Sequence, residues 1–163
     1  MKIGFIRENY KRFYKKNKKA IDKAIINCHE KGDYTLRKDV WDLEKGIAKL
    51  VGTKYCASAN SGTDALFLSL LALGIKKGDQ VITVSNTFIA TIQAIIHTGA
   101  EPILIDVGED ELMNVNQLEA AVTPYTKAII PVQYTGAICN MPKIQEIAEK
   151  YKLHIVDDYC QAL

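Results

Sequence analysis

Asn60-Ser61-Gly62-Thr63-Asp64-Ala65-Leu66 is the stretch from which the rest of the chain can be understood. It lies between a strand-like run, residues 55–59, and an apolar run of helical character that continues to residue 73. A strand that turns through a glycine into a helix directs free N–H groups and the positive end of the helix dipole to one point, which suits a phosphate. Ser and Thr before a helix are also ordinary N-caps, so this stretch alone predicts either a phosphate site or a cap.

The composition is that of one globular domain, with 48% hydrophobic and 25% charged residues among 163. The net charge of +2 favours no class of partner, but nine of the basic residues fall within residues 1–23, beside only two acids. Such a segment fits a patch for nucleic acid or an anionic membrane, or a solvated helix face. The interleaved aromatic and aliphatic residues favour the helix face. A nucleic-acid partner is least favoured, because no base-stacking motif follows.

The cysteines indicate a reducing compartment, because they are isolated and form no C-x-x-C pair or metal-ligand spacing with histidine. They are Cys28, Cys56, Cys139 and Cys160. The basic N-terminus has no apolar run after it, so we expect no signal peptide. Residues 81–100 carry no formal charge, but polar residues divide them into a strand and a helix. We therefore expect a cytoplasmic protein with no membrane span and no metal site.

Short apolar runs alternate with runs of helical periodicity through most of the chain. The predicted strands are 55–59, 81–84, 102–106, 128–132 and 153–156, and the predicted helices are 9–31, 39–51, 64–73, 88–97, 116–122 and 142–151. Asn116 and Asn140 are the expected caps of the last two helices. This order predicts an α/β fold, with a mostly parallel sheet and helices on both faces.

Polar residues follow four of the predicted strands at the point where each strand ends. They are Ser61-Gly62-Thr63, Asn86-Thr87-Phe88, Gln133-Tyr134 and Asp157-Asp158. Because open parallel sheets bind ligands beyond the carboxyl ends of their strands, these residues predict a single site.

Five segments in order, residues 61–66, 86–91, 99–102, 123–132 and 157–163, closely resemble the DegT/DnrJ/EryC1/StrS family of pyridoxal-phosphate-dependent sugar aminotransferases. The resemblance implies an incomplete large domain of the aspartate-aminotransferase type over residues 33–163, preceded by a basic helical segment, residues 1–32. It also implies a homodimer with the site at the subunit interface. Family members aminate a nucleotide-linked keto sugar, with glutamate or glutamine as the amino donor.

By the same resemblance, Gly62 and Thr63 hold the phosphate of pyridoxal 5'-phosphate and Phe88 stacks on its ring. Asp158 bonds the ring nitrogen, and Gln161 lies near the ring hydroxyl. A carboxylate beside the ring nitrogen favours its protonated form, which then withdraws electrons from the substrate. Taken singly, Phe88 is more typical of a core than of a cofactor site and Asp158 more typical of a helix cap, and Gln161 also fits a surface position.

The chain departs from the family at the residue that aminotransfer requires. The family's Schiff-base lysine follows the Asp-x-x-Gln segment, whereas only five residues follow Asp158 here and none is a lysine. Arg37 also stands where many members have glycine, and Asp157 where glutamate is common. We therefore expect an N-terminal fragment, inactive alone. The alternatives are a truncated, non-catalytic module that pairs with a full-length subunit, or a relative of the pyridoxal-phosphate-dependent sugar dehydratases.

The family's strand order separates strand 55–59 from the other four strands, because the strands between them would come after Leu163. We expect the remaining four to form a contiguous sheet. A buried strand without neighbours leaves its polar backbone groups unpaired, at a cost of about 1–3 kcal/mol each. The chain is therefore expected to be marginally stable, or to pair residues 55–59 with residues 154–156.

Overall fold

The computed structural model describes residues 5–32, 34, 35 and 37–162, with side chains described from Tyr10 onward. The chain divides into two compact units, Met1–Ser58 and Ala59–Leu163. The first unit contains α1 (Phe5–Lys31) and α2 (Lys38–Val51), which confirms the two predicted N-terminal helices. Helix α2 ends at Gly52, whose φ of 73° is left-handed and suits glycine.

The predicted strand at residues 55–59 is wrong, because no strand pairing occurs there in the described part of the chain. Both the N–H and the hydroxyl of Ser58 instead donate to Glu44 Oε1 of α2, each at 2.8 Å. The expected pairing with residues 154–156 is also wrong, since the strand at those residues pairs with a different partner. A strand forms only where a neighbouring strand shares its hydrogen bonds, and the described chain places none beside residues 55–59.

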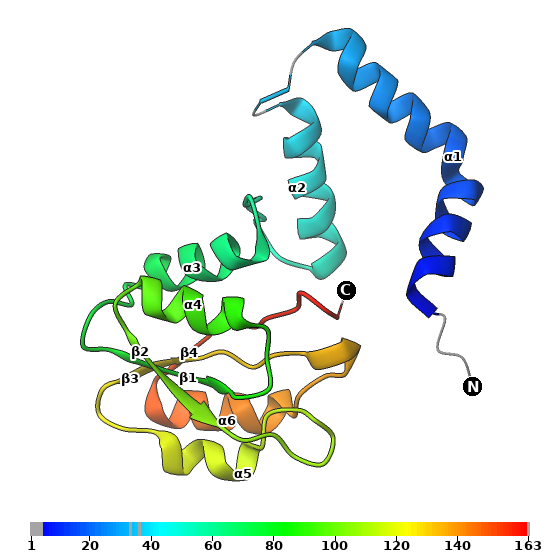
Figure 1. Cartoon of the computed structure of the whole chain (residues 1–163). Helices are drawn as coiled ribbons and strands as arrows, with labels where there is room; N and C mark the ends of the chain where they lie inside the picture. The colour runs from blue at the N-terminus through cyan, green and yellow to red at the C-terminus, as the bar shows by residue number, and fades with distance from the viewer. Residues whose placement is uncertain (1–4, 33, 36, 163) are drawn as a thin grey trace. The chain divides into compact units, whose positions relative to one another are not determined.

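The second unit is a parallel four-stranded sheet in the order β2-β1-β3-β4 (Figure 1). Its strands are β1 (Gln80–Val84), β2 (Glu101–Ile105), β3 (Thr126–Ile129) and β4 (His154–Ile155). The contiguous sheet of four strands is thus confirmed. Strand β3 stops earlier than predicted because Pro131 has no N–H to continue the ladder. Val132 returns to pair with Asp158 in an isolated parallel bridge.

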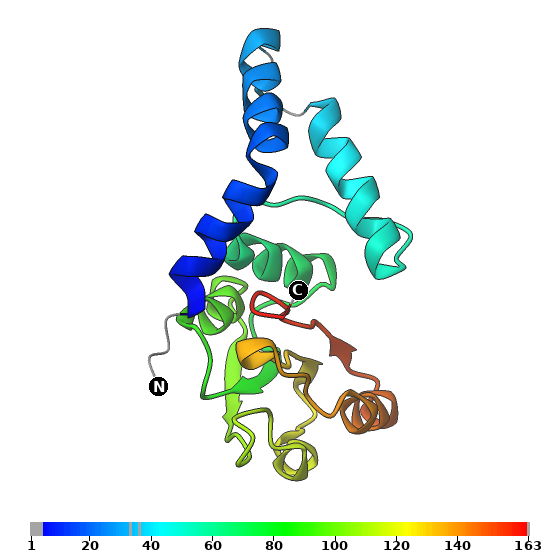
Figure 2. The same cartoon turned by 90° about the vertical axis from the view of Figure 1, so that its right-hand side faces the viewer.

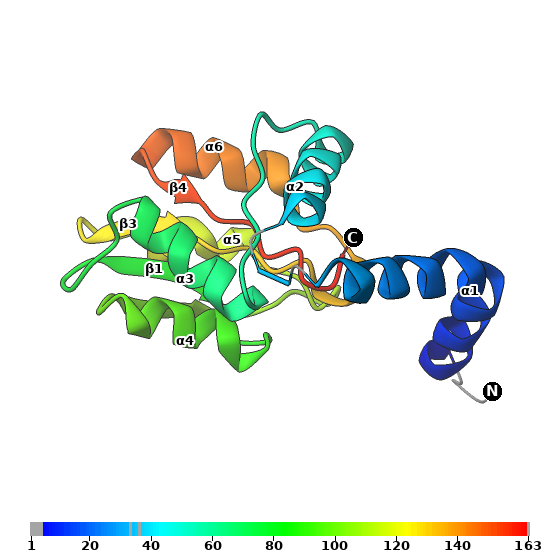
Figure 3. The same cartoon turned by 90° about the horizontal axis from the view of Figure 1, so that it is seen from above.

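Helices cover both faces of this sheet, as predicted. Helices α3 (Gly62–Ala72) and α4 (Ile89–His97) lie on one face, and α5 (Val115–Leu118) and α6 (Met141–Tyr151) lie on the other (Figures 1 and 2). Figure 3 looks down on the face that α3 and α4 cover. Successive side chains of a strand point to opposite faces of the sheet, so the same strands supply an apolar core on each face. Val81 packs on the α3 and α4 side, whereas its neighbour Ile82 packs on the α5 and α6 side.

The predicted helix 116–122 is replaced by α5 and the short 3-10 helix η1 (Glu119–Ala121). Its cap is Asn114 rather than Asn116, because the Asn114 N–H donates to the Asp106 carbonyl and places its side chain ahead of the helix. Asn114 Oδ1 then accepts the Asn116 N–H at 3.1 Å. Asn140 caps α6, as predicted, by accepting the Lys143 N–H.

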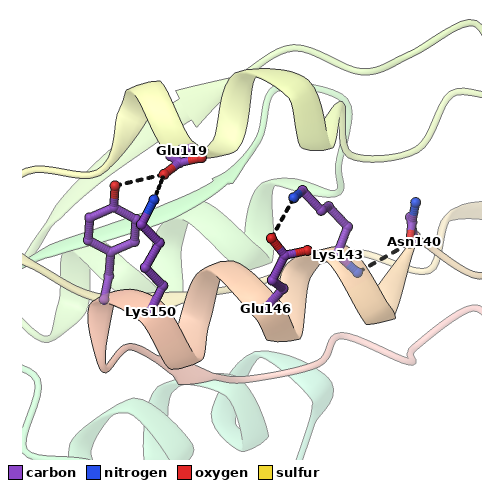
Figure 4. A network of polar contacts seen from close by, with 6 residues as sticks. Glu119, Asn140, Lys143, Glu146 and Lys150 are labelled. Carbon is purple, nitrogen blue, oxygen red and sulfur yellow. Dashed lines mark hydrogen bonds and ion pairs between the residues drawn. The ribbon is translucent and has the colours of Figure 1, made fainter.

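A polar network joins η1 to the end of α6 (Figure 4). Glu119 Oε1 accepts from the Lys150 ammonium and, at 2.8 Å, from the Tyr151 hydroxyl. The hydrogen bond with Lys150 is the main cause that lowers the pKa of Glu119 from its ordinary value of 4.5, and the bond with Tyr151 is the next. A second pair, Lys143–Glu146 at 2.8 Å, lies within α6 itself.

We predict that Glu119→Gln lowers the melting temperature of the chain at pH 7 by a small amount, as for other exposed pairs. A lowered carboxyl pKa stabilises the fold above 4.5, and this contribution is lost as the pH falls through the folded-state pKa. The deficit of Glu119→Gln in melting temperature, measured by circular dichroism, should therefore shrink as the pH falls below 4.5. Glu146→Gln is the matched control, and a Glu119→Gln deficit that grows as the pH falls would contradict the interpretation.

Candidate functional site

A cavity of about 230 Å³ opens in the second unit, beyond the carboxyl ends of the strands. All five residues predicted as cofactor-binding line it, although they come from three separate parts of the sequence. Its lining residues are Gly62, Thr63, Leu66, Thr87, Phe88, Ala90, Thr91, Val132, Asp158, Cys160 and Gln161.

One wall of the cavity is the start of α3. Ser61 is its N-cap, and Ser61 Oγ accepts the Asp64 N–H at 3.1 Å. The first intrahelical bond runs from the Ala65 N–H to the Ser61 carbonyl. The N–H groups of Gly62 and Thr63 precede that bond, in the turn where helices lack internal carbonyl partners. The capping and phosphate-binding interpretations are therefore compatible, since they use different N–H groups.

Space rather than backbone conformation favours glycine at position 62. A Cβ at this position would lie 2.9 Å from Cys160 Sγ, closer than real Cβ atoms approach. The hydrogen bond with Asp158, followed by burial, raises the pKa of the Cys160 thiol to about 11. The thiol is therefore protonated at neutral pH. It connects the start of α3 with the carboxylate on the opposite wall.

That carboxylate, Asp158, is only 6% exposed and is held on both oxygens. Its Oδ2 accepts the Thr91 hydroxyl at 2.9 Å, and its Oδ1 accepts the Cys160 N–H at 3.1 Å. Its backbone N–H donates to the Pro131 carbonyl, and its own carbonyl accepts the Gln133 N–H. The described residues after Asp158, 159–162, form a turn and no helix.

Phe88 and Gln161 complete the predicted set. Phe88 precedes α4 and is 68% exposed, so its ring is a free apolar surface at the cavity rather than part of the core. Gln161 is exposed, as its surface interpretation expected, but its Oε1 accepts the Thr135 N–H at 3.0 Å. This bond orients the side-chain amide beside the cavity.

Gln133, the polar residue predicted at the end of β3, does not line the cavity but bonds to Asp157, the neighbour of Asp158. It is fully buried; its Nε2 donates to Asp157 Oδ1 at 2.6 Å, and its Oε1 accepts the Cys139 N–H at 2.6 Å. Burial is the main cause that raises the pKa of Asp157, and the charge of Asp158 adds to it. The hydrogen bond from Gln133 acts in the opposite direction.

Sequence reasoning missed Thr91 and Cys160 as functional residues. Thr87 Oγ1 lies 3.0 Å from Thr91 Oγ1, so the two threonines and Asp158 form a connected chain. The sequence offered one signal for Thr91: Thr87 and Thr91 are four residues apart, which places their hydroxyls on the same side of a helix start. The lining residues include neither lysine nor histidine. The described part of the chain also contains no metal-binding cluster and no helix able to cross a membrane.

Comparison with known proteins gives consistent results. A model of the DegT/DnrJ/EryC1/StrS aminotransferase family matches residues 15–163. A Pseudomonas aeruginosa protein, UDP-2-acetamido-2-deoxy-3-oxo-D-glucuronate aminotransferase, is 40% identical over 147 residues, which are 89% of this chain and 41% of the relative. The chain thus spans about two fifths of that relative.

Two solved structures extend the similarity to three dimensions. S. venezuelae DesV in complex with a ketimine intermediate is 37% identical with a TM-score of 0.90, over 93% of this chain and 41% of that one. Bacillus subtilis NtdA with bound PMP is 34% identical with a TM-score of 0.87, over 91% and 34%. The predicted fold, part of an aspartate-aminotransferase-type large domain, is confirmed.

We predict that Gly62→Ala displaces the Cys160 side chain and destabilises the chain by about 1 kcal/mol, the low end of the usual cost of overpacking, because the new methyl meets Cys160 Sγ at the end of an exposed side chain. Urea unfolding measures the effect, and adding Cys160→Ala should recover most of it. Gly46→Ala in α2 is the control, since nothing lies within 4 Å of its Cβ and alanine favours helices. A loss that Cys160→Ala does not relieve would count against the contact.

Asp157→Asn should raise the melting temperature at pH 7. A carboxyl with a raised pKa contributes its stability below the ordinary value of 3.8 and loses it as the pH rises through the folded-state pKa. The amide keeps the acceptor for Gln133 without the buried charge. Thermal unfolding at pH 3 and pH 7 tests this prediction, and a variant less stable than the parent at pH 7 would refute it.

Proposed function

We propose that this chain, which belongs to the DegT/DnrJ/EryC1/StrS aminotransferase family, forms the pyridoxal-phosphate-binding part of an aminotransferase for a nucleotide-linked keto sugar. The observation that carries the proposal is the shared cavity of Gly62, Thr63 and Asp158. The chain spans about two fifths of its relatives, so the complete activity belongs to the longer enzyme.

The residues present fit the cofactor at each of its chemical groups. The Gly62 and Thr63 N–H groups and the dipole of α3 suit a phosphate. The buried Asp158 carboxylate suits a protonated ring nitrogen, since an opposite charge favours the cationic form. The exposed ring of Phe88 offers a stacking surface, and the oriented amide of Gln161 offers hydrogen bonds to the ring hydroxyl.

When bound, the cofactor supplies an electron sink for breaking the Cα–H bond of the amino donor. The residues of this chain would bind the phosphate at Gly62 and Thr63, hold the proton on the ring nitrogen at Asp158 and stack on the ring at Phe88. A Schiff-base lysine is a separate requirement. Because no described lining residue is a lysine, we assign that group to a part of the enzyme outside the cavity walls seen here.

The remaining assignments also follow from the family. We assign cofactor binding to residues 33–163 and regard residues 1–32 as a basic helical segment. The substrate would be a nucleotide-linked keto sugar, in keeping with the UDP-linked substrate named for the Pseudomonas aeruginosa relative. Glutamate or glutamine would be the amino donor, and two copies would form the enzyme. The free cysteines support a cytoplasmic location.

We predict that the chain binds pyridoxamine 5'-phosphate reversibly and that inorganic phosphate competes with it. Asp158→Asn should weaken binding at least tenfold, because the ring nitrogen loses its counter-charge. Asp157→Asn, one residue away and outside the cavity lining, is the comparison variant and should weaken binding much less than Asp158→Asn does. Isothermal titration calorimetry measures both.

With pyridoxal 5'-phosphate, borohydride should trap no adduct at a single lysine. Reduction followed by peptide mass spectrometry checks this. A specific adduct would show that the chain brings its own Schiff-base lysine to the cavity, and equal binding by the parent and Asp158→Asn would refute the proposed site.

A further inference from the structure

We propose that Thr91 is a positioning residue for the Asp158 carboxylate, and that Thr87 polarises the Thr91 hydroxyl by donating a hydrogen bond to it. The inference deepens the proposed function, on which it rests, by naming what aims the carboxylate at the ring nitrogen. It is carried by the chain of contacts from Thr87 through Thr91 to Asp158.

The direction of this hydroxyl chain follows from the chemistry of its members. An ionised carboxylate accepts hydrogen bonds but cannot donate them, and a threonine hydroxyl has one proton. Thr91 therefore donates that proton to Asp158 Oδ2, at 2.9 Å. Its oxygen must then accept from Thr87, whose Oγ1 lies 3.0 Å away. The two hydroxyl dipoles point the same way, toward the carboxylate, and each strengthens the other in a buried site.

Other hydroxyls on these helices satisfy themselves locally. Ser69 in α3 donates to the Ala65 carbonyl at 2.7 Å, and Thr98 after α4 donates to the Ile95 carbonyl at 2.7 Å. Thr91 is 1% exposed, yet its hydroxyl bonds to a carboxylate 67 positions along the chain. The Thr91 hydroxyl therefore bonds to Asp158 rather than to a backbone carbonyl of its own helix.

The contact has a geometric consequence. The Cys160 N–H holds Oδ1 of the carboxylate from within its own turn, and Thr91 holds Oδ2 from a different element. Two donors on different oxygens stop rotation of the carboxylate. The Thr91 N–H also donates to the Phe88 carbonyl at 3.1 Å, so the residue that orients the carboxylate is tied to the residue at the ring face.

The experiment uses the full chain with Thr91→Val, Thr91→Ser and Thr87→Val, and pyridoxamine 5'-phosphate labelled with ¹⁵N in the ring. The pH at which the bound ring nitrogen loses its proton is read by NMR. We expect Thr91→Val to lower it by about one unit, a tenfold loss. Thr91→Ser should restore the parent value, and Thr87→Val should cause a smaller shift in the same direction.

Thr98→Val is the control, because its hydroxyl bonds only near its own helix end, and it should leave the titration unchanged. A second readout needs no cofactor: the ¹³Cγ resonance of Asp158 should move in Thr91→Val and return in Thr91→Ser. An unmoved resonance, or a Thr91→Val ring titration like that of the parent, overturns the inference. If the parent binds no cofactor, the proposed function fails, and the Asp158 resonance still decides whether Thr91 controls the carboxylate.

Discussion

The contact between Cys160 and Gly62 is the constraint on which the site depends. Cys160 follows the strand tip that carries Asp158, and its sulfur occupies the space that a side chain at the start of α3 would need. The same residue donates its N–H to the Asp158 carboxylate. One short loop thus sets the distance between a helix start suited to phosphate and a buried acid suited to a ring nitrogen. Neither wall forms the proposed pocket without the other.

Parallel strands bring these walls together because they end at one edge. Val132 and Asp158 pair beyond the last regular hydrogen bonds of β3 and β4, so the parallel pairing continues as far as the cavity. Helix α4 follows strand β1, and Phe88 just before it and Thr91 in its first turn both line the site. The chemistry of the site is therefore distributed over several elements, although each contributes only one or two side chains.

The sequence predicted what depends on local patterns. Alternation of apolar runs indicated the parallel sheet, and Asn140 before Pro142 marked the start of α6. Residues 55–59 resemble a strand in composition but have no strand partner in the described chain, and pairing depends on a neighbour that the local pattern does not reveal. Thr91 and Cys160 could not be identified, since their roles arise from contacts with residues distant in sequence.

The most direct test of the central claim is a crystal structure of the chain with pyridoxamine 5'-phosphate. The account predicts the phosphate on the N–H groups of Gly62 and Thr63, with the ring nitrogen of the same molecule within hydrogen-bond distance of Asp158. A phosphate bound at the start of α3 with the ring directed away from Asp158, or a molecule bound elsewhere, would contradict it.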